Sequence, residues 1–262
     1  MSEGRMVFRT FTLLLATLAV LALAVGTPFT AIGLVALPVY LAVILTGVMV
    51  PQLAMFAPMV LRLDSTAQEI ALTFDDGPGA TSTREVLAVL AGFGAKATFF
   101  VLGEKVRATP DILREIAEAG HAIGIHGDWH DRLFSLRHPG RIVAEIERAR
   151  DAVAAITGQR PSLLRPPLGH VSPRTAVAAK RLGMTLVGWT VRGRDGLAGA
   201  TAEAVQRRVV SGLRPGAIVL LHDAAERDDR VPAGVTALPA IITEANRRGL
   251  RCVPMSQSRG PA

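Results

Sequence analysis

The sequence lacks features that would identify a redox compartment or a nucleic-acid partner. Cys252 is the single cysteine, so no disulfide can form within the chain, and cysteine usage does not identify the compartment. The 29 Lys and Arg exceed the 22 Asp and Glu, and the formal charge is +7. No basic run is interleaved with aromatic residues, however, and no nucleic-acid module is recognisable. We therefore expect no nucleic-acid partner, and the charge favours a surface that tolerates anionic lipid or an anionic glycan.

Charge is missing altogether from residues 10–61, which also lack histidine. A bilayer crossing takes about 20 apolar residues, so this stretch is too long for one helix. The Gly-Thr-Pro at 26–28 interrupts it and predicts two transmembrane helices, about 7–25 and about 30–50, followed by an interfacial segment. Residues 1–62 are thus predicted to be a membrane anchor. A cleavable signal peptide is the alternative for the first segment.

The membrane topology is left open by the sequence. Arg5 and Arg9 favour a cytoplasmic N-terminus. Two crossings would then return the rest of the chain to the cytoplasm, whereas one uncleaved crossing would leave it outside. We expect a protein of the cell membrane in either case.

Residues 63–262 have the pattern of one α/β domain, in which short apolar runs alternate with amphipathic stretches. The predicted strands are 70–74, 97–101, 122–126, 162–165, 185–189, 218–222 and 251–254. The predicted helices are 83–91, 111–119, 141–156, 173–182, 202–212 and 236–248. Such alternation predicts parallel strands in a barrel or a doubly wound sheet.

Polar residues follow several of these predicted strands, and the carboxyl ends of parallel strands meet on one face of a barrel. Asp75 and Asp76 are adjacent and can divide metal ligation and general base catalysis between them, although such a pair alone is more often a turn. His126 and His130 are four residues apart, a spacing that would place two imidazoles on one helical turn to bind one metal. Together with an aspartate they suit zinc or a similar divalent ion. His222 ends a buried strand and, taken alone, could equally be a core histidine.

The whole set resembles the polysaccharide deacetylases, which carry the NodB homology domain and are also called carbohydrate esterase family four. The resemblance covers residues 69–254 in five blocks that occur in the family's order. The blocks are 73–78 (TFDDGP), 126–130 (HGDWH), 165–169 (RPPLG), 189–196 (WTVRGRDG) and 220–223 (LLHD).

The resemblance implies a role for each matching residue. Asp75 would be the general base, oriented by Arg165, and Asp76 would bind the metal with His126 and His130. The general acid would be His222, with Asp195 setting its protonation state. The backbone N–H of Leu168 would help to hold the oxyanion, and Leu220 would line the pocket for the acyl methyl group. The substrate-contacting residues are therefore expected to be Leu168, Leu220, Pro167 and Trp189.

The family's fold is a distorted parallel (β/α) barrel, here of about seven strands, and its reaction is metal-dependent hydrolysis of N-acetyl groups from amino sugars. The expected partner is a peptidoglycan-, chitin- or exopolysaccharide-like glycan, with the catalytic domain extracytoplasmic. This sequence departs from the family pattern at Gly127, Leu168, Arg192 and Gly196. Arg192 is a cation at a position where the family has an acidic residue. Gly196 has no side chain to form one wall of the pocket. The altered second and fourth blocks leave a glycan-binding pseudoenzyme as one alternative. The membrane hairpin and a possible cytoplasmic placement leave deacylation or deformylation of a lipid-linked sugar as another.

Overall fold

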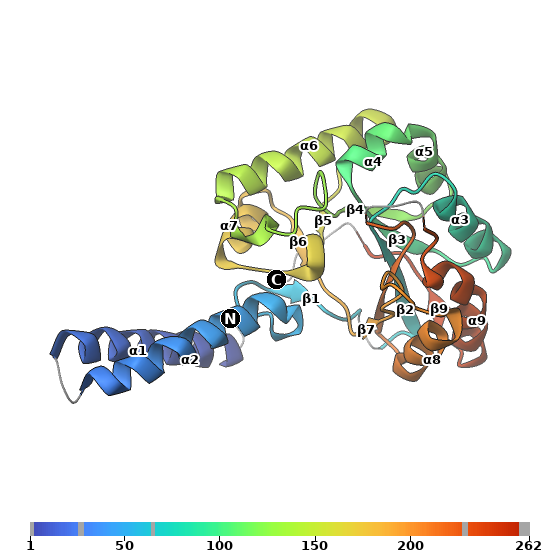
Figure 1. The fold of residues 1–262 in the computed structure, drawn as a ribbon. Helices are drawn as coiled ribbons and strands as arrows, with labels where there is room; N and C mark the ends of the chain where they lie inside the picture. Colours follow the sequence, from blue (N-terminus) through green and yellow to red (C-terminus); the bar gives the residue numbers. More distant parts are fainter. Residues whose placement is uncertain (1–2, 26–28, 64–65, 227–229, 257–262) are drawn as a thin grey trace.

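One parallel β-sheet forms the centre of the computed structural model, which describes residues 3–25, 29–63, 66–226 and 230–256 (Figure 1). The strand order is β1-β6-β5-β4-β3-β2-β8-β7, and β9 pairs with the beginning of β2. The strands are β1 (Met59–Val60), β2 (Glu69–Asp75), β3 (Ala97–Val101), β4 (Ala122–Ile125), β5 (Leu163–Leu164), β6 (Thr185–Val187), β7 (Val191–Arg192), β8 (Ile218–His222) and β9 (Arg251–Cys252).

The strand count differs from the prediction of about seven. All seven predicted strands form, and the structure adds β1 and β7, each of only two residues. Neither was predicted as a strand, because β1 lies within the uncharged stretch that was predicted to be interfacial and β7 lies within the fourth sequence block. Within the described residues β1 and β7 are the two edges of the sheet and do not pair with each other, so the sheet curls into an open half-barrel.

Helices cover the outer face of this curved sheet (Figure 1). They are α3 (Ser82–Gly92), α4 (Gly103–Ala108), α5 (Pro110–Glu118), α6 (Pro139–Thr157), α7 (Pro173–Arg181), α8 (Ala202–Gly212) and α9 (Ala233–Arg247). The six predicted helices all form, and α4 is additional. At α7, the hydroxyl of Ser172 accepts hydrogen bonds from the N–H groups of Arg174 and Thr175, and Pro173 occupies the first turn.

Both faces of the sheet are buried, which explains why its strands are apolar runs without alternation. Along β2, Leu72 and Phe74 pack in the large core beneath the helices, whereas Ala71 packs in a smaller cluster on the inner face. Successive side chains of a strand point to opposite faces, so Asp75 lies on the same inner face as Ala71. The carboxylate of Asp75 therefore lies in the interior of the half-barrel, at the carboxyl end of β2.

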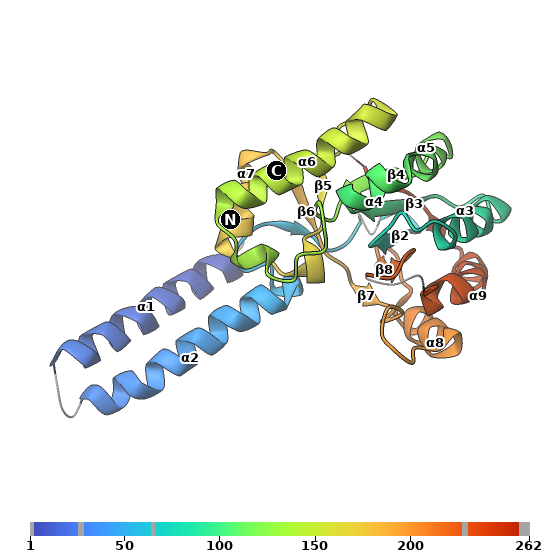
Figure 2. The ribbon, with the colours of Figure 1, turned by 45° about the horizontal axis from the view of Figure 1, so that its top comes forward.

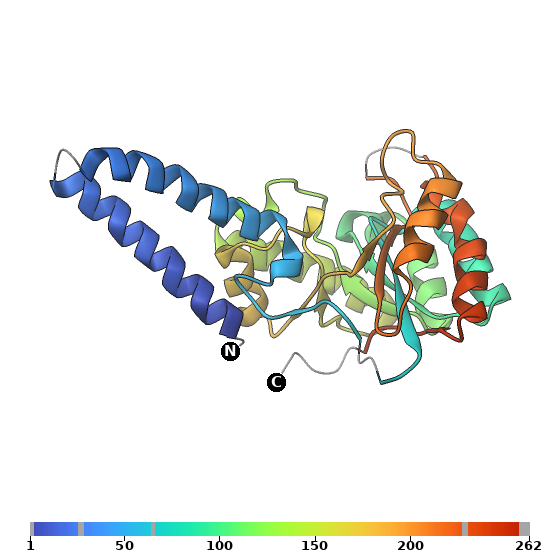
Figure 3. The same ribbon diagram turned by 90° about the horizontal axis from the view of Figure 1, so that it is seen from below.

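The N-terminal segment forms the two predicted helices, α1 (Glu3–Val25) and α2 (Phe29–Met49), which lie side by side and project away from the sheet (Figures 2 and 3). The predicted break at 26–28 lies outside the described residues. Among the residues described, no helix is both long and apolar enough to span a bilayer, so the two predicted crossings are not supported by the structure.

The stretch after α2 was predicted to be interfacial. It instead forms a 3-10 turn, Pro51–Leu53, and then β1, which joins the sheet beside β6. The hairpin is also tied to the domain directly, because the N–H of Val171 donates to the carbonyl of Val48 at 3.1 Å. The end of α2 is therefore held against the segment that follows the third sequence block.

Candidate active site

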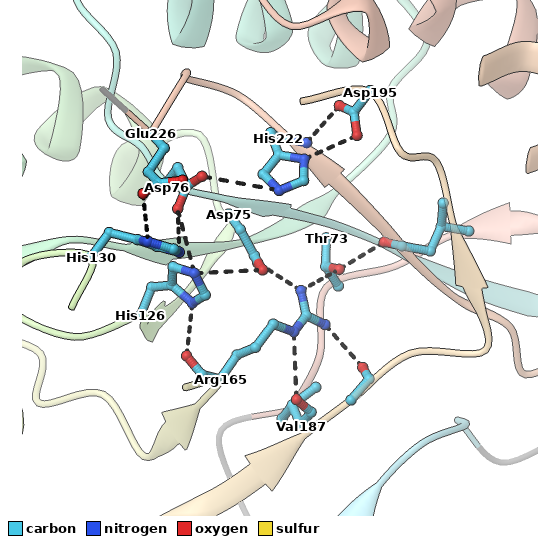
Figure 4. A network of polar contacts seen from close by, with 12 residues as sticks. Thr73, Asp75, Asp76, His126, His130, Arg165, Val187, Asp195, His222 and Glu226 are labelled. Atoms are coloured by element: carbon cyan, nitrogen blue, oxygen red, sulfur yellow. Dashed lines mark hydrogen bonds and ion pairs between the residues drawn. The ribbon is translucent and has the colours of Figure 1, made fainter. Parts of the chain in front are cut away.

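The predicted catalytic residues gather at the carboxyl end of the sheet (Figure 4). In the pairing of β2 with β8, Asp75 lies opposite His222. His126 directly follows β4, and Arg165 directly follows β5. Four segments far apart in sequence therefore meet at one place because their strands are parallel and in register.

Arg165 holds Asp75 in place. Its guanidinium is fully buried, and Nη1 donates to Oδ1 of Asp75 at 2.7 Å and to the hydroxyl of Thr73 at 2.8 Å. Nη2 donates to the carbonyl of Gly188 at 3.0 Å, and the guanidinium carbon lies 4.2 Å from the centre of the Phe100 ring. Burial alone would raise the pKa of Asp75, but the charges of Arg165, His126 and His222, together with the Arg165 hydrogen bond, outweigh it and lower that pKa. Asp75 is therefore a carboxylate at neutral pH and can accept a proton.

Asp76, His126 and His130 form a cluster in which one ligand atom from each lies within 4.8 Å of the others. Oδ1 of Asp76 lies 3.4 Å from Nε2 of His126 and 3.7 Å from Nε2 of His130. Asp76 has a φ of 72°, in the left-handed region, so it points away from the direction that Asp75 takes. This turn points the two adjacent carboxylates in different directions, which the predicted division between metal ligation and general base catalysis requires.

The two histidines are not on a helix, and that part of the prediction is wrong. Residues 126–130 form a loop after β4. Gly127 within it has a φ of 110°, and a Cβ there would lie 3.1 Å from the carbonyl oxygen of Trp129. The loop geometry therefore requires glycine at the position where the family usually has a hydroxyl side chain.

A divalent ion fits this cluster. Nδ1 of His126 lies 2.7 Å from the carbonyl oxygen of Arg165, so the N–H is on Nδ1 and a lone pair on Nε2. Burial lowers the pKa of His126, which keeps the ring neutral. That lone pair faces Oδ1 of Asp76, a buried oxygen without a hydrogen-bond partner. Two lone pairs 3.4 Å apart repel unless a cation lies between them.

Glu226 is a further residue of this cluster that sequence reasoning missed. Its Oε1 lies 3.3 Å from Nδ1 of His130, at ion-pair distance but without hydrogen-bond geometry. Arg132 donates two hydrogen bonds to the same carboxylate, from Nε to Oε1 at 3.0 Å and from Nη2 to Oε2 at 2.8 Å. Glu226 lies in a loop after β8, where no periodicity or motif signals its role, so only the fold brings it to His130.

His222 and Asp195 form the second functional pair. Nδ1 of His222 lies 2.9 Å from Oδ1 of Asp195, whose Oδ2 accepts the backbone N–H of His222 at 2.8 Å. Burial alone would lower the pKa of His222, but the charge of Asp195 and its hydrogen bond, aided by Asp76 and Asp75, raise it to about 9. The ring is therefore protonated at neutral pH and can donate a proton from Nε2, which lies 4.0 Å from Oδ2 of Asp76.

The predicted substrate contacts also surround this centre. Leu168 has a φ of 59°, a strained conformation for leucine, in the turn Pro167–Gly169. A Cβ on Gly169 would lie 2.3 Å from the ring of Trp189, so glycine allows the turn to pack on that ring. Leu220 is buried on the inner face of β8, two residues before His222. These positions place a small apolar wall beside the reacting groups.

Fold and site together define the class of protein: a parallel α/β domain with an Asp-His-His cluster that could hold a metal ion, next to the buried carboxylate of Asp75 and the protonated His222. A sequence model described as polysaccharide deacetylase matches residues 62–187. The peptidoglycan-N-acetylglucosamine deacetylase PgdA of Listeria monocytogenes is 36% identical over 195 residues, 74% of this chain and 40% of that relative. The chitooligosaccharide deacetylase of a Bradyrhizobium species is 32% identical over 206 residues, 74% of this chain and 91% of that relative.

Among solved structures, a family 4 acetyl xylan esterase of Clostridium thermocellum in complex with a cobalt ion is similar with a TM-score of 0.65 at 32% identity. That similarity covers 71% of this chain and 87% of the other. The chain belongs to the polysaccharide deacetylase family. It spans only 40% of the length of the Listeria relative, so that protein contains much that this chain does not match.

Proposed function

We propose that this protein hydrolyses N-acetyl groups on amino sugars of a glycan, with a divalent metal ion as cofactor. The observation that carries the proposal is that an ionised base, Asp75, and a protonated acid, His222, each lie within 4.0 Å of a residue of the Asp76 cluster. Hydrolysis of an amide needs both, because water must lose a proton as it attacks and the amine must gain one as it leaves.

The residues of the chain supply the proton transfers. Asp75, held by Arg165, accepts a proton from the attacking water as its oxygen bonds to the acyl carbon. The backbone N–H of Leu168 would stabilise the negative charge that develops on the carbonyl oxygen. His222 then donates its Nε2 proton to the nitrogen as the C–N bond breaks, which yields acetate and a free amino sugar.

Asp76, His126 and His130 would hold the metal ion. When bound, a divalent ion supplies Lewis-acid polarisation of the carbonyl and makes water more acidic. The two imidazoles and one carboxylate suit zinc, and also cobalt, the ion in the structure of the xylan esterase.

The substrate that we propose is a peptidoglycan- or chitin-like glycan. Support comes from the relatives, one of which is a peptidoglycan-N-acetylglucosamine deacetylase and another a chitooligosaccharide deacetylase. Because every group needed for turnover is in place, we favour an active enzyme over a glycan-binding pseudoenzyme.

We also propose that the α1–α2 hairpin attaches the protein to the cell membrane, with the catalytic domain on the extracytoplasmic side. Residues 10–61 carry no charge, and large apolar side chains on the hairpin are exposed, such as Leu13 at 69% and Leu34 at 70%. Reporter fusions after Val25, after Leu61 and at the C-terminus would test the side. Recovery of the full chain as soluble protein without detergent would contradict the attachment.

Acetate release tests the proposed activity. The full chain in detergent, loaded with zinc or cobalt, would be incubated with acetylated peptidoglycan fragments and chitooligosaccharides, and acetate and free amine would be measured. We expect both products in equal amounts from the wild type and a large loss in Asp75→Asn. Release that is equal in the two proteins would overturn the assignment.

A further inference from the structure

A cleft lies next to the catalytic centre and shares Leu168 and Trp189 with it. Its volume is about 640 Å³. One side is formed by Leu168, Trp189, His170, Arg192, Arg194 and Arg208, and the other by the end of α2 and the turn after it. We call it the arginine cleft.

The charge of this cleft is unbalanced. Among the described residues, no aspartate or glutamate lines it. In the described parts of the chain, none of its three arginines forms an ion pair with an acidic side chain, although many other arginines do. Arg208 donates to the carbonyl of Gly193 at 2.7 Å, which leaves its charge uncompensated. Three cations therefore face one space without a counter-charge from the protein, an arrangement that favours an anionic ligand.

The backbone supports the same interpretation. Arg194 has a φ of 59°, a conformation that long side chains rarely adopt. Two of the other non-glycine residues with positive φ in the described chain are Asp76 and Leu168, both in the active site. Strain of this kind is retained where the position of a side chain matters, and it therefore points to a use for the Arg194 side chain.

The arginine cleft is continuous with the catalytic centre. Two guanidinium groups lie close to the Trp189 ring. The Cζ atom of Arg165 is 5.8 Å from the ring centre, and the Cζ atom of Arg192 is 5.6 Å from it. Arg165 in turn holds Asp75. Leu168, whose N–H faces the reacting carbonyl in the proposed function, is also a wall of the cleft. A glycan whose acetylated sugar lies at Asp75 can thus place a neighbouring unit against the arginines.

We propose that the arginine cleft is a subsite for an anionic group, a carboxylate or a phosphate, carried by the sugar unit next to the one that is deacetylated. This inference rests on the proposed function, because it assigns a substrate class to the same site. Guanidinium groups suit both anions, since their planar N–H donors match pairs of carboxylate or phosphate oxygens. Trp189 adds an apolar ring on which a sugar face can pack.

The test compares matched substrates. The full chain would be assayed on three acetylated oligosaccharides that differ only in the unit beside the N-acetylglucosamine: neutral, with a carboxylate, or with a phosphate. The arginines are exposed, so each contact contributes modestly, and we expect kcat/KM to favour the acidic substrates by roughly five- to thirtyfold, mainly through KM. Arg192→Gln combined with Arg194→Gln should abolish that preference. Arg207→Gln is the matched control, because Arg207 is exposed on α8 beside Arg208 but does not line the cleft.

The outcomes separate the subsite from the activity. A preference for the carboxylate alone or the phosphate alone supports the subsite and identifies its anion. Equal rates on all three substrates, or a preference that survives the double variant, would overturn it. If no substrate is turned over, the proposed function fails, and calorimetric titration of the acidic and neutral oligosaccharides still decides the subsite. Tighter binding of the acidic ligand, lost only in the double variant, would then support it, and equal binding would refute it.

Discussion

Replacement of Asp195 by asparagine tests how the protein keeps His222 protonated. The carboxylate accepts two converging hydrogen bonds, from the backbone N–H and from Nδ1 of His222. Asparagine has one side-chain oxygen and carries no charge, so it can satisfy only one of these donors and cannot stabilise the imidazolium. With that charge removed, burial dominates, and we expect the pKa of His222 to fall from about 9 to about 6.5 or below.

The magnitude follows from the pKa change. A shift of about 2.5 units corresponds to roughly 3.4 kcal/mol between the two protonation states. At pH 8 the protonated fraction would fall from about 90% to about 3%, a loss of roughly thirtyfold in rate. At pH 6 both proteins would be largely protonated and the difference would be small. The pH at which kcat/KM falls on the alkaline side should therefore be lower in the variant by about two pH units or more.

The loss of stability in Asp195→Asn relative to the wild type should be largest at low pH, whereas its loss of activity should be largest at high pH. The two losses can therefore be told apart. The folded-state pKa of His222 is raised, so the pair stabilises the fold fully below pH 6.5, and that contribution is lost as pH rises through about 9. The variant should therefore be least stable relative to the wild type at low pH, where its activity is least affected. Unfolding of the variant cannot mimic a rate loss confined to high pH.

The assay is acetate release from one substrate between pH 6 and pH 10, with bound metal measured at each pH. Thermal unfolding would be followed over the same range. Asp151→Asn is a suitable control, since it removes a carboxylate that is exposed on α6. An alkaline limb at the same pH in wild type and Asp195→Asn would refute the assignment of His222 as the acid whose proton Asp195 retains.

Three further predictions concern the metal, the base and the packing around the acid. His126→Ala should lose the bound divalent ion as well as activity, measured by elemental analysis, whereas His138→Ala, at an exposed helix cap, should retain both; full metal occupancy in the first variant would contradict the ligand set. Asp75→Asn should keep the ion and lower kcat by about 10²- to 10⁴-fold, and loss of the ion instead would show that Asp75 is a ligand. Gly234→Ala would place a Cβ 2.3 Å from Oδ2 of Asp195, so it should displace that carboxylate and move the alkaline limb in the same direction as Asp195→Asn; an unchanged limb would count against this coupling.

The sequence by itself predicted the α/β class of the fold and the residues that gather at the candidate site. The apolar runs that end in Asp75 and His222 are short and alternate with amphipathic stretches, a pattern that favours buried parallel strands, and polar residues at the carboxyl ends of such strands meet on one face. The start of the helix at Pro173 could also be predicted, since Ser172 and the proline are local signals that act within one turn. In each case the physical cause lies within a few neighbouring residues.

Only the tertiary structure decided features that depend on distant segments. His126 and His130 lie in a loop in which Gly127 adopts a positive φ, and their four-residue spacing does not reveal this. Glu226 lies near His130 because of how the loop after β8 packs. The two residues of β7 form a strand because they pair with the edge of β8. The arginine cleft likewise forms where β7, its following loop, α8 and the end of α2 meet. An uncompensated cluster of charge is a property of the folded surface, because pairing depends on which side chains approach in space, and sequence order does not specify that.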